Sequence, residues 1–214
     1  MAIEAVLFDY GGVFTPSPFG AITAYAHSVG ADPVAFREIV FGSYHLDSDH
    51  PWHRCERGEL PVVETWAAIC AEVEAAGYDF DLAQMFSAMT GGGDDRAIVV
   101  DAVREVRSRG IRTAIVTNNV REYGDSWRSA LPLDELFDTV VDSSHEGVRK
   151  PNPAIFAIAL ERLGVHDPTT AVFLDDFEGN VEAARALGMH GIVVEDDPRG
   201  AIDELTRLLA AHGS

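Results

Sequence analysis

Positive charge is scarce in this 214-residue chain. The sequence has 16 Lys and Arg residues against 35 Asp and Glu, which gives a formal net charge of −19 at pH 7 and a pI near 4.6. Binding to nucleic acid or to an anionic membrane depends on basic side chains that attract phosphate groups. The composition therefore argues against both kinds of partner, and an anionic ligand would need positive charge that is concentrated locally.

Lysine is almost absent, because Lys150 is the only one and every other basic residue is an arginine. An ammonium group is a compact point charge with three rotatable donors, whereas a guanidinium is a planar fork. The count alone leaves two readings open. Lys150 is either an ordinary surface residue or a residue that a binding site requires to be lysine.

Cysteine is also scarce, and long apolar runs are missing. Cys55 and Cys70 are too few for a disulfide framework or a four-cysteine metal site, so we expect reduced thiols. The first apolar run carries Glu4 and Asp9, is far shorter than a membrane span and has no basic segment before it. The sequence thus predicts a cytoplasmic protein without a membrane partner.

Residues for a hydrophobic core are plentiful, since 47% of the chain is hydrophobic. Short Val- and Ile-rich stretches alternate with helical patterns from residue 94 onward, which is typical of a parallel sheet covered by helices on both faces. The predicted strands are 2–9, 111–117, 137–143, 170–176 and 190–195. The predicted helices of this part are 94–110, 153–164, 179–188 and 199–212.

Residues 16–93 interrupt this alternation. They contain no convincing strand, and their apolar spacing predicts helices at 18–29, 33–44, 59–76 and 79–90. Pro16 and Pro18 mark one edge of the segment, and Gly91-Gly92-Gly93 mark the other. We therefore predict an α/β core domain of residues 1–15 and 94–214, with a helical cap domain, 16–93, over the carboxyl edge of the sheet.

Polar residues gather where the predicted strands end. They are Asp9, Thr117-Asn118-Asn119, Arg149-Lys150 and Asp175-Asp176. In an open α/β sheet, ligands bind at the carboxyl ends of the strands. We therefore expect these side chains to converge on one site.

The same segments resemble the four motifs of the haloacid dehalogenase (HAD) superfamily, in the correct order. They read FDYGGVFT (8–15), IVTNN (115–119), RKPNPAIF (149–156) and FLDDFEGN (173–180). The helical insertion after the first motif resembles that of C1-capped members. Segments 52–66 and 174–189 look most similar to the branch that holds the phosphatase domain of soluble epoxide hydrolases and bacterial sugar-phosphate phosphatases. The resemblance implies a Rossmann-like parallel sheet with an inserted all-helical cap.

The resemblance also implies a Mg²⁺-dependent phosphatase for a small phosphorylated metabolite. Asp9 would be the nucleophile and would form an aspartyl phosphate. Asp9, Asp176 and the backbone carbonyl of Gly11 would hold the ion, and Asp175 would act behind them or through water.

Two further motifs would bind the phosphoryl group. Thr117 and Asn118 would offer polar groups to its oxygens where a helix begins. Lys150 would neutralise its charge during transfer, which would explain why the chain retains one lysine.

Gly11 departs from the usual pattern, because phosphatases of this superfamily normally have an aspartate there as general acid and base. Such catalysis contributes roughly 10² to 10⁴ in rate. We therefore predict a slow phosphatase that favours good leaving groups, as in anomeric, acyl or aryl phosphates. One alternative is a non-catalytic or regulatory scaffold that binds metal and phosphate. A 2-haloacid dehalogenase is disfavoured by Asp175-Asp176, since that enzyme needs no acidic pair.

The cap segment 44–53 is rich in polar residues and is predicted to be a solvated loop. His45, His50 and His53 are candidates for substrate recognition, proton transfer or a second metal site, and Glu56, just beyond, is a candidate for a substrate contact. A structural role for each is the alternative. The sequence leaves open the identity of the substrate and the oligomeric state, monomer or homodimer.

Overall fold

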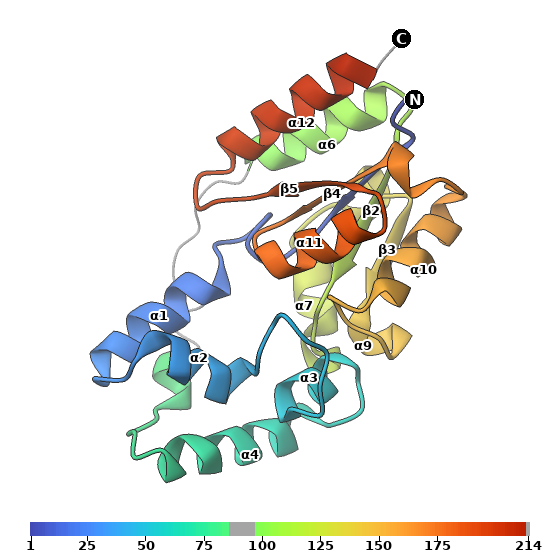
Figure 1. Ribbon diagram of the computed structural model, residues 1–214. Helices are drawn as coiled ribbons and strands as arrows, with labels where there is room; N and C mark the ends of the chain where they lie inside the picture. Colours follow the sequence, from blue (N-terminus) through green and yellow to red (C-terminus); the bar gives the residue numbers. More distant parts are fainter. Residues whose placement is uncertain (86–96, 213–214) are drawn as a thin grey trace.

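The computed structural model describes residues 1–85 and 97–212 (Figure 1). Within these residues, five parallel strands form one sheet in the order β3-β2-β1-β4-β5. The strands are β1 (Ala5–Phe8), β2 (Arg112–Thr117), β3 (Thr139–Asp142), β4 (Ala171–Asp175) and β5 (His190–Val193). The predicted fold class is confirmed, and each strand lies inside its predicted range.

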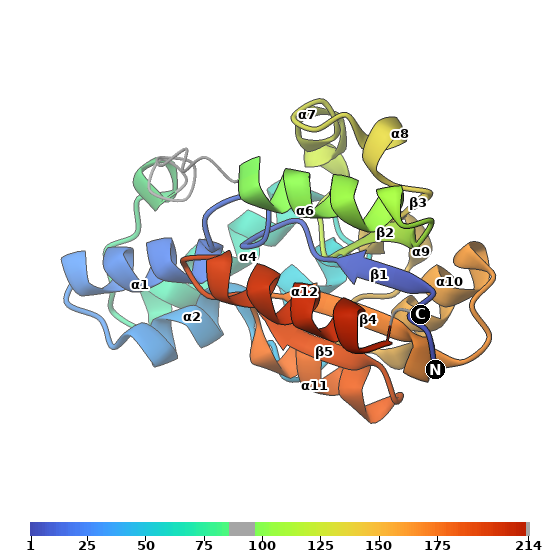
Figure 2. The same cartoon turned by 90° about the horizontal axis from the view of Figure 1, so that it is seen from above.

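The central strands are apolar on both faces because helices cover both sides of a parallel sheet. All residues of β1 and β4 are buried. Figures 1 and 2 show α6 (Ala97–Ser108) and α12 (Arg199–His212) side by side over one face, while α10 (Pro153–Leu163) and α11 (Glu178–Ala186) lie on the other. Alternate strand residues join the two layers, so Phe8 packs toward α6 and α12 and Leu7 toward α10 and α11.

The register of the strands brings the motif residues to one edge. Phe8 pairs with Ile115 on one side and with Leu174 on the other. Asp9 follows Phe8, and Asp175 follows Leu174. The two aspartates therefore lie next to each other at the carboxyl edge of the sheet.

The segment between β1 and α6 forms a helical layer at the carboxyl end of the sheet (Figure 1). Its helices are α1 (Pro18–Ser28), α2 (Pro33–Phe41), α3 (Pro51–Glu56) and α4 (Val62–Ala75), and residues 82–85 are also helical. They enclose an apolar cluster that includes Phe36, Trp52 and Ile69 and that extends to Val120 of the α/β part. Residues 86–90 of the helix predicted at 79–90, and the glycines at 91–93, lie outside the described residues.

Two predictions for this layer were wrong at their ends. Residues 44–50 are a loop, as predicted, and 45–49 are exposed, but α3 begins at Pro51 inside the predicted loop of 44–53. In addition, α2 ends at Phe41 rather than at residue 44. Gly42 ends α2 because its φ of +71° leaves the helical region, which glycine tolerates. Pro51 begins α3 at a position where no backbone N–H is needed, and Nδ1 of His50 accepts the N–H of Trp52.

Short helical turns connect the remaining elements, and the sequence analysis did not foresee them. They are η1 (Arg121–Tyr123), α7 (Gly124–Arg128), α8 (Leu133–Leu136), α9 (Ser143–Glu146) and η2 (Pro168–Thr170). Among the described residues, no helix combines the length and apolar character required to cross a membrane.

Candidate active site

Lys150 is completely buried and bridges two carboxylates. Its Nζ lies 2.7 Å from Oδ1 of Asp9 and 2.7 Å from Oδ2 of Asp175. Burial alone would lower the pKa of the ammonium group, but the two carboxylates outweigh burial and raise that pKa above its ordinary value. Lys150 is therefore a fixed positive charge inside the protein and not a surface residue.

Asn118 holds the backbone of Lys150 in place. Its Oδ1 accepts the N–H of Lys150 at 2.7 Å, and its Nδ2 donates to the carbonyl oxygen of Lys150 at 3.0 Å. Both ends of the amide are thus occupied by the chain itself, although Asn118 also lines the cavity described below. Thr117 ends β2 and is buried, with its hydroxyl 3.5 Å from the carbonyl oxygen of Asn118.

Three carboxylates surround this ammonium group. Asp9, Asp175 and Asp176 each offer an oxygen, and these oxygens lie within 4.8 Å of one another. Burial raises the pKa of Asp9 well above its usual value; Lys150 opposes this shift, while Asp175 and Asp176 add to it. Burial and then the charge of Asp175 raise the pKa of Asp176 to about 7.

Two residues that the sequence analysis missed complete the acidic cluster. The hydroxyl of Ser17, which caps α1, donates to Oδ2 of Asp176 at 2.5 Å. Nδ2 of Asn180 donates to both oxygens of Asp175, at 3.1 and 3.0 Å. The signal for Asn180 was its place in the fourth motif, because one turn of α11 carries it back toward the strand end.

The arrangement fits a hard divalent cation. Three carboxylates face one ammonium group, so the cluster has an excess of negative charge. The buried Oδ1 of Asn180 has no hydrogen-bond partner among the described residues. Carboxylate and amide oxygens are the ligands that Mg²⁺ prefers. Asp9, Asp176 and the carbonyl of Gly11, which lines the same cavity, are the groups that could hold the ion.

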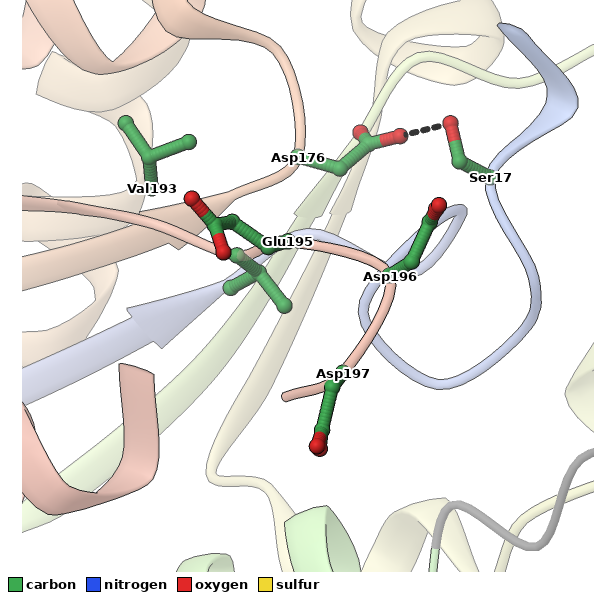
Figure 3. A pocket seen from close by; sticks show the side chains of 7 residues that line it. Ser17, Asp176, Val193, Glu195, Asp196 and Asp197 are labelled. Carbon is green, nitrogen blue, oxygen red and sulfur yellow. Dashed lines mark hydrogen bonds between the residues drawn. The ribbon is translucent and has the colours of Figure 1, made fainter. Parts of the chain in front are cut away.

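The cavity at this cluster is small, about 60 Å³. Its lining combines residues of the motif loops, namely Asp9, Gly11, Asn118, Lys150, Asp176 and Asn180, with a proline and three aromatic residues, namely Pro18, Phe19, Tyr44 and Phe177. Asp176 also faces a second, larger hollow on the β5 side, shown in Figure 3, where Glu195, Asp196 and Asp197 follow the strand. That hollow is acidic, so an anionic ligand would be repelled from it.

The four cap candidates are not among the residues that line the cavity. His45 is exposed, with its ring 4.9 Å from that of Phe177. His50 caps α3, and Nδ1 of the buried His53 accepts the N–H of Ser48 at 3.1 Å. Burial, followed by the charge of Arg149, lowers the pKa of His53 to about 3, so this imidazole is neutral. In the described part of the chain, these residues do not form a group close enough to hold a second metal.

Glu56 pairs with Arg149, which was expected to converge on the site with Lys150 but is not in the described cavity lining. Nε of Arg149 donates to Oε2 of Glu56 at 2.7 Å, and both side chains are buried. Nη1 of Arg149 donates to the carbonyl oxygen of Leu46 at 3.0 Å, and the guanidinium lies 4.8 Å from the ring centroid of Tyr44. The cap segment is thereby joined to the residue next to Lys150.

A family model described as haloacid dehalogenase-like hydrolase matches residues 3–188, which include all four motifs. The chain belongs to this family. The resemblance inferred from the sequence is confirmed, and the HAD-like hydrolase has Asp9, Lys150 and the acidic pair Asp175-Asp176 together at one edge of its sheet.

Relatives of this hydrolase include proteins that are much longer. Acyl-CoA dehydrogenase family member 10 of Mus musculus is 35% identical over 96% of this chain, and bifunctional epoxide hydrolase 2 of Mus musculus is 28% identical over 97%. The chain spans only 19% and 39% of their respective lengths. Sesquiterpene phosphatase astK of Aspergillus oryzae is 25% identical over 90% of each chain.

The fold is shared with solved HAD structures. A HAD-family enzyme of Bacteroides thetaiotaomicron, solved with magnesium and inorganic phosphate, has a TM-score of 0.59 and 21% sequence identity. The match covers 92% of this chain and 96% of that chain. At this identity the likeness establishes the common fold.

Proposed function

We propose that this hydrolase is a Mg²⁺-dependent phosphatase that releases phosphate from a small phosphorylated compound. The observation that carries the proposal is the buried Lys150, whose ammonium group is shared between Asp9 and Asp175 beside the half-buried Asp176. Such a group of three carboxylates and one cation suits a phosphate dianion and a divalent ion bound together. Phosphatases among the relatives and the solved magnesium–phosphate complex also support it.

Asp9 is the proposed nucleophile. Its Oδ1 accepts the N–H of Tyr10 and faces Lys150, and Oδ2 has no hydrogen bond within the described residues. Oδ2 attacks phosphorus, the bond from phosphorus to the leaving oxygen breaks, and the leaving group departs with that electron pair. Water then attacks the phosphorus of the aspartyl phosphate, which releases inorganic phosphate and restores the carboxylate.

The other residues stabilise the charge of the reacting groups or hold them in position. Lys150 stabilises the negative charge on the transferring group, and Asn118 keeps Lys150 in register. Thr117 and the backbone around Asn118 are proposed to bind phosphate oxygens. Asp9, Gly11 and Asp176 would hold Mg²⁺, which would supply further charge stabilisation. Asp175 orients Lys150 by accepting a hydrogen bond from its Nζ. Because Gly11 has no side chain to protonate the leaving oxygen, good leaving groups are favoured.

We also propose that residues 16–93 act as a cap domain over a core of 1–15 and 94–214. The apolar cluster that the helical layer encloses supports this division. Opening of the layer would admit a substrate, since the cavity beneath it holds little more than a phosphoryl group.

The test is phosphate release from p-nitrophenyl phosphate and acetyl phosphate, with Mg²⁺ or with a chelator. We expect Mg²⁺-dependent release that Asp9→Asn abolishes. The exposed Asp49→Asn is the matched control, and it should retain the activity. Equal, negligible release by the wild type and Asp9→Asn would indicate a binding scaffold. Chloride release from 2-chloropropionate without phosphate release would indicate a dehalogenase.

A further inference from the structure

Three aromatic rings from separate parts of the chain meet on the wall of the active-site cavity. Phe19 comes from α1, Tyr44 follows α2, and Phe177 follows β4. Their ring centroids are 5.0 Å (Phe19–Tyr44), 5.3 Å (Phe19–Phe177) and 5.5 Å (Tyr44–Phe177) apart, within the range of mutual aromatic contact. We call these three residues the aromatic wall.

The aromatic wall presents ring surface to the cavity and offers a substrate no free hydrogen-bonding group of its side chains. The hydroxyl of Tyr44 donates to Oε1 of Glu56 at 2.5 Å and accepts from Nε1 of Trp52 at 3.1 Å. Both partners belong to α3 and are absent from the described cavity lining. The polar end of Tyr44 is therefore held by the interior of the cap.

The polar residues of the cavity are engaged at its phosphoryl end. Lys150 pairs with Asp9 and Asp175, Asn118 holds the backbone of Lys150, and Ser17 holds Asp176. Among the described lining residues, Lys150 is the only cationic one. Two guanidinium groups lie against rings of the aromatic wall, Arg149 at 4.8 Å from the ring centroid of Tyr44 and Arg37 at 5.9 Å from that of Phe19. Arg149 is buried and paired with Glu56, and neither arginine is in the described cavity lining. Inside the cavity, a second phosphate group, as in a nucleotide or a bisphosphate, would therefore meet no cation other than Lys150.

We place the leaving group against this wall. The cavity of about 60 Å³ has room for little more than a phosphoryl group, so the rest of a substrate extends toward the rings. Burying sugar hydroxyls there without partners is unfavourable, whereas burying a hydrocarbon is favourable. A phenolic leaving group also needs little protonation, which suits Gly11.

From this juxtaposition, and resting on the phosphatase function above, we propose that Phe19, Tyr44 and Phe177 select phosphate monoesters with an apolar leaving group. Aryl phosphates satisfy both the aromatic wall and Gly11. Sugar phosphates and nucleotides are disfavoured, so the specificity differs from that of sugar-phosphate phosphatases.

The test compares n-hexyl phosphate with glucose 6-phosphate. Both leaving groups are primary alcohols with six carbons, so the ratio of their kcat/KM values isolates polarity from leaving-group reactivity. We expect a ratio of about ten or more in favour of hexyl phosphate, the discrimination that an apolar pocket typically reaches. Phe177→Ala and Phe19→Ala should each bring the ratio toward one, and the ratio does not depend on the fraction of folded enzyme.

Phe80→Ala is the matched control, because Phe80 packs against Tyr25 and Phe36 within the cap and is outside the described cavity lining. It should leave the ratio unchanged. A wild-type ratio at or below one, or a ratio that neither wall variant alters, overturns the proposal. Hydrolysis of acetyl phosphate distinguishes a failure of the proposed specificity from a failure of the proposed phosphatase function. If its Asp9-dependent hydrolysis persists while the ratio fails, only the specificity is wrong; if it is not hydrolysed either, the phosphatase function itself is wrong.

Discussion

Gly11 and Gly12 are adjacent in the first motif, but they are constrained differently. At Gly11 an added Cβ would meet no atom within 4 Å. At Gly12 the φ is +74°, and an added Cβ would lie 2.1 Å from Cγ of Asp176. The first position therefore has unused space beside Asp9, whereas the second needs glycine so that Asp176 can approach the backbone.

Restoring a carboxylate at position 11 should increase the activity. We expect Gly11→Asp to raise kcat/KM for n-hexyl phosphate by about tenfold or more, because general acid catalysis contributes roughly 10² to 10⁴ and the poor alkoxide leaving group needs it. The gain for p-nitrophenyl phosphate should be smaller. Gly11→Asn is the control of equal size without a transferable proton, and an equal gain from Asn would contradict this role.

Gly12→Ala should damage both the fold and the ion site. The left-handed backbone costs of order 1–3 kcal/mol for a residue with a Cβ, and the contact with Asp176 displaces a proposed ligand. We expect a lower midpoint in denaturant unfolding and a weaker response of activity to Mg²⁺. Gly11→Ala is the neighbouring control, for which we expect no comparable loss of Mg²⁺ response.

The connection between α3 and the loop before α10 depends on one buried ion pair. Glu56 and Arg149 are both buried, and Tyr44 and Trp52 also donate to Glu56. Burial of two charges is costly, so their pairing does not guarantee net stability. Removal of one partner, however, leaves the other charge buried without compensation.

Glu56→Gln should therefore lower the free energy of unfolding by about 3–5 kcal/mol, as measured in urea. Glu59→Gln is the matched control, since Glu59 pairs with Arg57 at the surface and such pairs contribute about 0–1 kcal/mol. The double variant Glu56→Gln with Arg149→Met should recover part of the loss. A double variant less stable than Glu56→Gln would show that the pair is not coupled in this way.

Local sequence patterns were sufficient for the five strands and for the long helices that cover the sheet, but not for the short helical turns between them. Each strand is a short apolar run that ends in polar residues, and strand ends in a parallel sheet share an edge, which is why the convergence of Asp9, Lys150 and Asp175 could be predicted. The helix α3 could not be predicted in the same way. Its six residues are too few to show helical periodicity, and the histidines before Trp52 suggested solvent.

Interactions between distant residues were also beyond sequence reasoning. Glu56 was a candidate for substrate contact, but it pairs with Arg149, which is 93 positions away. Asn118 was expected to bind phosphate, yet its amide holds the backbone of Lys150. In both cases the residue type was informative, but its partner depended on how α3 and the motif loops pack together.

The whole molecule is acidic, and this charge extends to the edge of its active site. Glu195, Asp196 and Asp197 line the second hollow, which Asp176 also borders (Figure 3). Within the cluster itself, burial and mutual repulsion raise the pKa values of Asp9 and Asp176. A divalent cation bound there would offset this repulsion, so ion binding and stability should be linked through pH.

The sign of this linkage follows from Asp176. Its pKa is about 7 in the folded protein against 3.8 for a free carboxyl, so between these values the folded state binds more protons than the unfolded state. The stability of the metal-free protein should therefore fall as the pH rises from about 4 to about 7. His53 acts in the opposite direction, because its lowered pKa removes stability as the pH falls below about 6.5.

Mg²⁺ should consequently raise the melting temperature more at about pH 8 than at about pH 5.5, where a proton on Asp176 competes with the ion. Scanning calorimetry with Mg²⁺ or with a chelator at both pH values measures the difference. His53→Gln should change the pH dependence of the metal-free protein at low pH but keep the difference caused by Mg²⁺. Asp176→Asn should reduce that difference, and an equal Mg²⁺ effect at both pH values in the wild type would contradict the assignment of Asp176 as a ligand.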